Sequence, residues 1–159
     1  MQLTHRIEKA EDWDIVRFSG DIDEEAEIVL SSLPSQLSGQ CIFDLKDIQS
    51  VNSCGVRAWI NFMRAAEKNS KLIFEGCTPE IVSQINMIPN FKGDAHVRSV
   101  YASYVCDSCD TQKLELFEEG KNLPKEVGEE LAEVNCPSCN EVMEMEELED
   151  EFFGWLEAS

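Results

Sequence analysis

Residues 44–55 read Asp-Leu-Lys-Asp-Ile-Gln-Ser-Val-Asn-Ser-Cys-Gly, and this stretch decides the fold. An apolar run, 41–43, precedes it, and an amphipathic run, 56–63, follows it. This order predicts a buried strand, a short polar turn and a helix. Ser53 is the predicted N-cap of the helix, because its hydroxyl oxygen can accept a hydrogen bond from a free backbone N–H. We expect the hydroxyl to be exposed at the positive end of the helix dipole, where a phosphate group is stabilised.

The composition is that of a soluble protein with one ordinary domain and a small annex. The chain has 159 residues, of which 43% are hydrophobic and 28% are charged. No apolar run approaches the roughly 20 residues that a membrane helix needs, and no basic-then-apolar secretion signal opens the sequence. We therefore expect a cytoplasmic protein that does not insert into membranes.

The negative charge is concentrated in the last third of the chain. Residues 1–104 carry 15 acidic and 10 basic side chains, whereas residues 105–159 carry 17 acidic and 3 basic side chains. The total of −19 is thus divided into −5 and −14. So acidic a surface repels phosphate backbones, which predicts that the C-terminal part binds no nucleic acid.

Strand and helix patterns alternate through the first hundred residues. A helix is expected to begin at the acidic cluster 23–25 and to end at Pro34, and Ser19-Gly20 indicates a turn before it. Thr78 is predicted to cap a third helix, with Pro79 at its first position. Strands are expected at 3–9, 13–18, 40–45, 71–75 and 96–104. The alternation predicts an α/β domain with a mixed, largely parallel sheet.

Four of the seven cysteines form two Cys-x-x-Cys pairs. Cys106 and Cys109 are separated from Cys136 and Cys139 by 26 residues. Four thiolates form a tetrahedral set that suits Zn²⁺, and the short apolar segments beside each pair resemble the hairpins of a zinc ribbon. Because all four ligands are cysteines, no position stays open for water, which predicts one structural zinc ion per chain. Redox-active disulfides and an iron–sulfur cluster are the alternatives.

The other candidates for chemistry have simpler interpretations. His5 and His96 stand beside no nucleophile motif and are expected at the surface or at a strand edge. Cys41, Cys54 and Cys77 are expected to be small core residues. Of these, Cys54 lies at a helix N-terminus, where the pKa of a thiol can fall. We predict no catalytic residue and do not expect an enzyme.

The last segment is predicted to form an acidic amphipathic helix. Leu148, Phe152, Trp155 and Leu156 recur at helical spacing on an acidic background. We expect this stripe to pack back on the α/β domain or to bind a partner. The predicted parts of the chain are an α/β domain at 1–104, a zinc ribbon at 105–144 and this tail helix at 145–159.

The strand, turn and helix around Ser53 resemble the motif of STAS domains, the fold of anti-sigma-factor antagonists. In that family an apolar strand and Asp-Leu are followed, at the spacing found here, by Asp-Ser-Ser-Gly-Leu. At the corresponding place in this chain, residues 52–56 read Asn-Ser-Cys-Gly-Val. Later segments stand where the family has its next strand, a Ser/Thr-Pro helix start and a helix end: 71–76, 78–80 and 88–91. The resemblance covers about residues 3–100 and implies a STAS-like domain of a bacterial protein. The family's closing helix is not visible before the cysteines begin.

The resemblance implies a regulatory switch at this turn. In the family a cognate serine kinase, often itself an anti-sigma factor, phosphorylates the residue that corresponds to Ser53, and the modification breaks the complex. A phosphate adds about −1.5 to −2 charges in the middle of a docking surface. Asn52 replaces the family's Asp, and Cys54 replaces its second Ser.

The predicted function is that of a non-enzymatic regulatory module that binds a protein partner, with the zinc ribbon as a rigid second contact. The partner is expected to be a serine kinase that acts as an anti-sigma factor, or a subunit of a larger complex. The predicted docking surface consists of Asn52, Ser53, Cys54, Gly55, Arg57 and Thr78. One alternative is an unphosphorylated STAS scaffold of a transport or signalling complex. A third is a redox or metal-handling protein.

Overall fold

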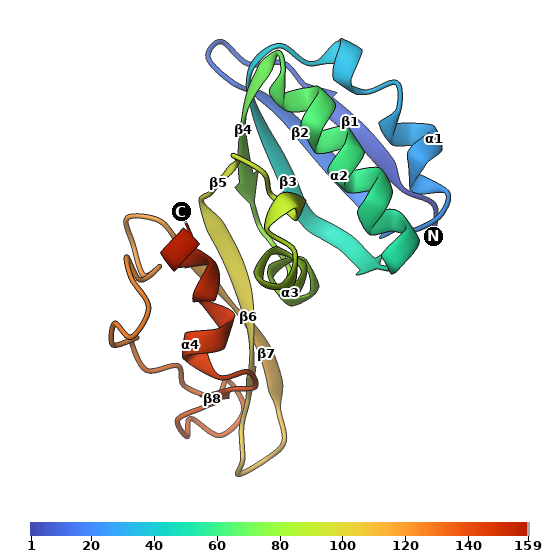
Figure 1. Cartoon of the computed structure of the whole chain (residues 1–159). Helices are drawn as coiled ribbons and strands as arrows, with labels where there is room; N and C mark the ends of the chain where they lie inside the picture. The colour runs from blue at the N-terminus through green and yellow to red at the C-terminus, as the bar shows by residue number, and fades with distance from the viewer. Residues whose placement is uncertain (159) are drawn as a thin grey trace.

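The computed structural model describes residues 1–158, which form two β-sheets and the helices around them (Figure 1). The first sheet has the strand order β1-β2-β3-β4-β5, and the second has the order β7-β6-β8. The strands are β1 (Thr4–Glu8), β2 (Asp14–Ile22), β3 (Gly39–Val51), β4 (Ser70–Glu75), β5 (His96–Val97), β6 (Ser99–Val105), β7 (Gln112–Glu118) and β8 (Glu144–Met145). The helices are α1 (Ala26–Leu30), α2 (Ser53–Glu67), α3 (Pro79–Met87) and α4 (Glu149–Phe152), with 3-10 turns at Pro34–Gln36, Pro89–Phe91 and Gly154–Ala158.

The first sheet is mixed and largely parallel, which confirms the predicted fold class. β1 pairs antiparallel with β2, whereas β2, β3, β4 and β5 pair in parallel. α1 and α2 lie on one face of this sheet (Figure 1). The core between them is aromatic: the Trp59 indole packs on Phe18 and Phe91 and donates a hydrogen bond of 2.9 Å to the Phe91 carbonyl. Burial of these large rings supplies much of the stability of this layer.

α2 follows the predicted amphipathic pattern and is the longest helix of residues 1–158, with 15 residues. Its buried side carries Gly55, Val56, Trp59, Phe62, Met63 and Ala66. The polar residues Arg57, Asn61, Arg64 and Lys68 are exposed, as their spacing predicts. No helix in the described part of the chain combines the length and the apolar character that crossing a bilayer requires.

Two turns expected from the sequence lie inside strands. Ser19-Gly20 belongs to β2, and β3 runs to Val51, six residues past its expected end. Both departures have one cause, because β2 and β3 stay paired as far as Ile22 and Val51, with irregular register at two places. Gly20 permits this path: its φ is +106°, and an added Cβ would collide with the backbone of the N-terminal segment.

The strand expected over 96–104 divides between the two sheets. β5 pairs with β4 in the first sheet, whereas β6 is the central strand of the second. Arg98 lies between them: its N–H donates to the Phe74 carbonyl at 2.8 Å, and its carbonyl accepts from the Glu119 N–H at 2.9 Å. β6 therefore runs across the predicted boundary at residue 104.

The tail packs against α3, as one of the two expectations for it states. Phe152, Phe153 and Trp155 are buried. The Asn86 side chain, on α3, donates hydrogen bonds of 3.1 and 3.0 Å to the Glu151 and Phe152 carbonyls. The aromatic part of the predicted stripe thus extends the core of the α/β part, whereas Leu148 is exposed.

The prediction of one continuous tail helix is wrong. Met145 belongs to β8 and pairs with Tyr104, so the segment starts as a strand. α4 has only four residues, and a 3-10 turn follows at Gly154. Glycine is a poor helix former, and the β8 pairing fixes the entry of the chain, so a single long helix is not formed.

Candidate functional site

The N-cap of α2 is Asn52 and not Ser53, which corrects the sequence prediction. Asn52 has extended backbone angles (φ −112°, ψ 172°), and its Oδ1 accepts a 2.8 Å hydrogen bond from the Gly55 N–H. The Asn52 N–H in turn donates to the Ile22 carbonyl at 3.0 Å, because β3 remains beside β2 to this point. The long strand thus moves the cap one residue earlier, and Ser53 becomes the first helical residue.

The first turn of α2 lies directly on the end of β2. A Cβ added at Gly55 would lie 1.9 Å from the Ile22 carbonyl oxygen and 2.6 Å from the Asp23 nitrogen. Only glycine permits this approach, which fixes the depth at which the helix enters the sheet. The start of α2 is thus fixed against the end of β2, while the outer side of its first turn is exposed.

The predicted docking residues at this junction are largely exposed. Asn52, Ser53, Cys54 and Arg57 are exposed, whereas Gly55 is buried. The expectation of a core position for Cys54 is therefore wrong, because the thiol lies on the outer side of the first turn. Cys41 and Cys77 are buried, as expected, and burial raises the pKa of both thiols.

Thr78 lies at a second strand–helix junction. As predicted, it caps α3: its Oγ1 accepts from the Ile81 N–H at 3.3 Å, and Pro79 is the first helical residue. It follows the end of β4, where Glu75 pairs with Asp44. β3 continues seven residues beyond Asp44, which corresponds to roughly 23 Å of extended strand. The structure therefore groups residues 52–57 and places Thr78 at a separate junction.

The electrostatic surroundings of Ser53 are mixed. The Asn52 amide donates a 3.0 Å hydrogen bond to Glu24, and this bond lowers the pKa of the Glu24 carboxyl. Arg57 follows Ser53 by four residues, which places both on the same side of α2. The site thus offers a helix N-terminus and a guanidinium, with one carboxylate held beside the cap.

The four cysteines of the two pairs come together at one point. Their sulfur atoms all lie within 4.8 Å of one another. Cys106 Sγ is 3.5 Å from Cys139 Sγ, and Cys109 Sγ is 3.6 Å from Cys136 Sγ. The thiols of Cys106 and Cys136 are buried, whereas those of Cys109 and Cys139 are exposed.

Both cysteine pairs adopt the same tight turn. In the first, the Cys106 carbonyl accepts from the Asp110 N–H at 2.8 Å, and in the second the Cys136 carbonyl accepts from the Asn140 N–H at 2.9 Å. Asp110 and Asn140 have φ values of 60° and 66°, a region that Asp and Asn tolerate better than most residues. Two equivalent turns thus present four thiols from opposite sides.

This donor set fits a single metal ion. A tetrahedron of sulfur atoms about 2.3 Å from a central ion has edges of about 3.8 Å, close to the separations found here. Backbone N–H groups support a charged Cys136: although burial raises the pKa of its thiol, the N–H groups of Cys139 and Ser138 hold it below its ordinary value. The Ser138 N–H points to the Cys136 sulfur at 3.4 Å. The four cysteines can therefore hold a metal.

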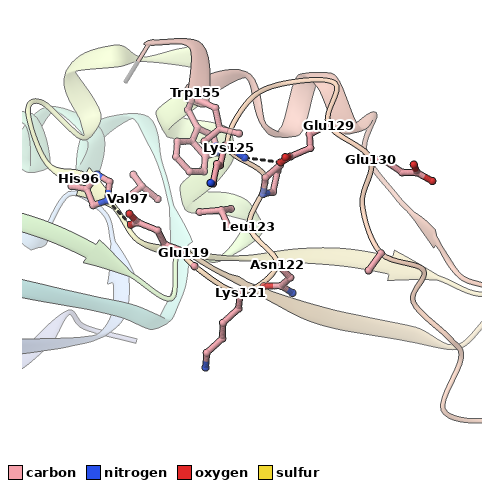
Figure 2. A pocket seen from close by; sticks show the side chains of 14 residues that line it. His96, Val97, Glu119, Lys121, Asn122, Leu123, Lys125, Glu129, Glu130 and Trp155 are labelled. Atoms are coloured by element: carbon pink, nitrogen blue, oxygen red, sulfur yellow. Dashed lines mark hydrogen bonds and ion pairs between the residues drawn. The ribbon is translucent and has the colours of Figure 1, made fainter.

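One cleft of the described residues was not predicted. It measures about 780 Å³ and lies where the loop after β7 meets β5 and the tail (Figure 2). Its wall includes Val97, Leu123 and Trp155. Within it, His96 pairs with Glu119, and Glu129 accepts a hydrogen bond from the Lys125 backbone N–H at 2.7 Å. His96 lies exposed on a strand edge, as expected. The cleft is formed by segments that are far apart in the sequence, so no local sequence pattern predicts it.

No family model and no curated protein sequence matches this chain. Among solved structures, the anti-sigma factor antagonist SpoIIAA in its unphosphorylated form aligns at 14% identity over 59% of this chain and 87% of that chain, with a TM-score of 0.45. An anti-sigma factor antagonist from Mycobacterium paratuberculosis aligns at 17% identity over 60% of this chain and 86% of that chain, with a TM-score of 0.45. At these identities such a likeness concerns the arrangement of the chain and not its function.

Proposed function

We propose that this chain is a non-enzymatic regulatory module that binds a protein partner at the start of α2 and is switched by phosphorylation of Ser53. The observation that carries the proposal is the position of Ser53 as the first, exposed residue of a 15-residue helix, directly after the Asn52 cap. The motif of residues 43–56 resembles that of anti-sigma-factor antagonists at the same place. The proposed setting is the cytoplasm, and the proposed partner is a serine kinase of the anti-sigma type.

A phosphate at Ser53 would be compatible with the folded domain. The first backbone N–H groups of a helix have no intrahelical acceptor, and the helix dipole favours a negative charge at this end. Arg57, one turn on, supplies a positive charge on the same side. The Asn52 cap uses the side chain of Asn52 and the N–H of Gly55, and the Gly55 contact is with the Ile22 backbone, so modification of the exposed Ser53 hydroxyl leaves both in place.

The same phosphate would disfavour a bound partner. It adds about −1.5 to −2 charges to the middle of the surface formed by residues 52–57. A partner that covers Ser53 would have to desolvate this charge, and an acidic partner would also be repelled. The proposed switch therefore acts on the complex and not on the fold.

We further propose that the cysteine cluster holds one structural Zn²⁺. Its four-sulfur donor set leaves no position for water or substrate, which favours a structural role. An iron–sulfur cluster would hold its thiolates farther apart, because several irons and bridging sulfides stand between them. The proposed ribbon gives the module a second rigid surface and, with its acidic composition, is suited to contact protein and not nucleic acid.

Mass spectrometry of the full chain after incubation with serine kinases of the anti-sigma type tests the switch. We expect phosphate on Ser53 in the wild type and none in Ser53→Ala, while Ser50→Ala, a matched control one residue before the end of β3, keeps the modification at Ser53. Ser53→Glu should keep the fold and weaken binding of the kinase.

Two results would separate the alternatives. Modification absent from Ser53, together with unchanged partner binding by Ser53→Glu, would contradict the switch and favour an unphosphorylated scaffold. Cysteines that form disulfides in the isolated protein, with less than one metal ion per chain, would favour the redox alternative.

A further inference from the structure

A second hollow lies on the C-terminal part of the chain, away from the Ser53 junction. It measures about 370 Å³ and is bordered by β6, β8, the segment before the second cysteine pair and the start of α4. In Figure 1, α4 lies beside β6, with β8 close to it. The lining residues are Tyr104, Leu131, Ala132, Glu133, Val134, Val142, Met143, Glu144, Met145, Glu147, Leu148 and Glu149. We call this surface the β8 groove.

The floor and walls of the β8 groove are apolar, and part of the apolar surface is exposed. Tyr104 and Met143 are 4% exposed and form its base, whereas Val142 and Leu148 are 52% and 68% exposed. Exposed aliphatic side chains grouped around a hollow are typical of a surface that another molecule covers. Met145 adds a flexible side chain that can adapt to a bound apolar group.

The rim of the β8 groove is uniformly acidic. Four of its lining residues are glutamates, and none is lysine, arginine or histidine. The pKa of Glu147 is raised, first by partial burial and then by repulsion from Glu146 and Glu151. The cleft of Figure 2, by contrast, also carries lysine and histidine side chains, and its His96 pairs with Glu119.

We propose that the β8 groove binds a cationic amphipathic segment of a protein partner. Apolar side chains of that segment would enter the hollow between Tyr104, Met145 and Leu148, and its lysine or arginine side chains would meet the glutamates of the rim. Complementary charge around an apolar centre is the usual arrangement of a specific interface.

The negative charge of the groove favours a cationic partner segment over a second copy of this chain or an anionic lipid surface. A second copy of the same acidic surface would bring like charges together, and anionic lipid would be repelled for the same reason. The C-terminal part carries 17 acidic side chains against 3 basic ones, so the long-range field also attracts a cationic partner. The proposal does not depend on phosphorylation of Ser53, because the groove lies on the second sheet and on the tail.

Methyl NMR on the full chain, labelled at its five methionines, tests the site. The probe is a synthetic peptide about 15 residues long, roughly four helical turns, with leucines on one face and lysines on the other. We expect the Met143 and Met145 methyl signals to shift on titration. Met1, Met63 and Met87 lie elsewhere and serve as internal controls, and their signals should stay in place. Equal shifts at all five methionines, or none, would overturn the proposal.

Matched peptides test the chemistry of the occupant. A peptide with glutamate in place of lysine, and one with serine in place of leucine, should each bind at least about tenfold more weakly, a difference of about 1.4 kcal/mol. If the serine peptide bound as tightly as the peptide with leucines and lysines, the interaction would be non-specific charge attraction, and the proposal would be wrong. Tighter self-association of the chain than binding of the lysine peptide would show that a second copy is the occupant.

Variants locate the contact. Leu148→Asp and Val142→Asp should weaken binding of the lysine peptide at least about tenfold, whereas Leu114→Asp, at a leucine 54% exposed on β7 outside the groove, should change it less than about twofold.

The contribution of the acidic rim is tested by a triple variant that combines Glu144→Gln, Glu147→Gln and Glu149→Gln. A control that combines Glu80→Gln, Glu126→Gln and Glu157→Gln changes the net charge equally. Equal effects of the two triple variants would contradict a site at the groove.

Discussion

The Cα of Gly55 lies so close to the carbonyl group of Ile22 that an added Cβ would stand 1.9 Å from the oxygen. This contact holds the first turn of α2 against the end of β2. We predict that Gly55→Ala destabilises the protein by about 3 kcal/mol or more, because neither backbone can move without breaking the β2–β3 pairing or the Asn52 cap. Chemical denaturation followed by circular dichroism measures the change.

Gly154→Ala is the matched control for this prediction. At that position the nearest atom to an added Cβ is Asn86 Oδ1, at 3.6 Å, which is an ordinary contact. We expect its free energy of unfolding to stay within about 0.5 kcal/mol of the wild type. If Gly55→Ala and Gly154→Ala had similar free energies of unfolding, α2 could move away from the sheet without loss of stability, and the prediction would be wrong.

The cap of α2 gives a second prediction. Asn52→Ala removes the 2.8 Å hydrogen bond to the Gly55 N–H and the amide contact with Glu24, and should cost about 1 kcal/mol, within a range of roughly 0.5 to 2. Asn52→Asp keeps a capping oxygen and should keep most of the stability. Asn61→Ala, at an exposed position further along α2, is the control and should change stability little. Equal losses from Asn52→Ala and Asn61→Ala would contradict the assignment of the cap.

Local sequence patterns predicted the α/β layer because its elements are fixed by short-range physics. The apolar run before Asp44, the amphipathic spacing of α2 and the Thr78-Pro79 helix start each specify an element independently of distant residues. The position of the cap was missed by one residue. Ser53 and Asn52 can both cap a helix, and the choice depends on how far β3 stays paired with β2, which is a tertiary property.

The second sheet and the clefts show what local patterns leave open. The Cys-x-x-Cys spacing indicated that four thiols converge, and the structure brings them together. Nothing near Arg98 indicates that the chain leaves one sheet for another, because this depends on hydrogen bonds to Phe74 and Glu119. The β8 groove and the cleft of Figure 2 likewise combine segments that meet only in the folded chain.

Removal of the proposed metal gives a third prediction. We expect one Zn²⁺ per chain by elemental analysis, released by a strong chelator or by acid, since thiolates bind metal and thiols do not. Cys106→Ser should lose the metal and unfold the second sheet, observed as loss of near-ultraviolet circular dichroism. The exposed Cys54 provides the control, and Cys54→Ser should retain the metal and the fold. Full zinc content in Cys106→Ser would contradict the ligand assignment.

The contact between α3 and the tail gives a fourth prediction. Asn86→Ala removes two hydrogen bonds to tail carbonyls and should destabilise the protein by about 1–2 kcal/mol. Truncation after Asp150 removes the buried rings of Phe152 and Trp155 and should lower the melting temperature further. Met87→Ala, at a 64% exposed position on α3, is the control and should be nearly neutral. Unchanged melting after truncation would show that the tail serves only a partner.

The raised pKa of Glu147 gives a fifth prediction, whose sign follows from linkage. Partial burial, with repulsion from Glu146 and Glu151, places the pKa of this carboxyl in the folded state above its unfolded value. The folded state therefore favours the protonated form, and stability falls as the pH rises through the folded-state pKa. Glu147→Gln removes this penalty, so its melting temperature should exceed that of the wild type at neutral pH. The two curves should converge below about pH 4, where the carboxyl is protonated in both states.

Glu126→Gln makes the same change in net charge at an exposed site outside the groove and separates a local effect from a general one. A wild type that melts at or above the temperature of Glu147→Gln at neutral pH would contradict the raised pKa, and with it the view that the groove rim lacks a positive partner.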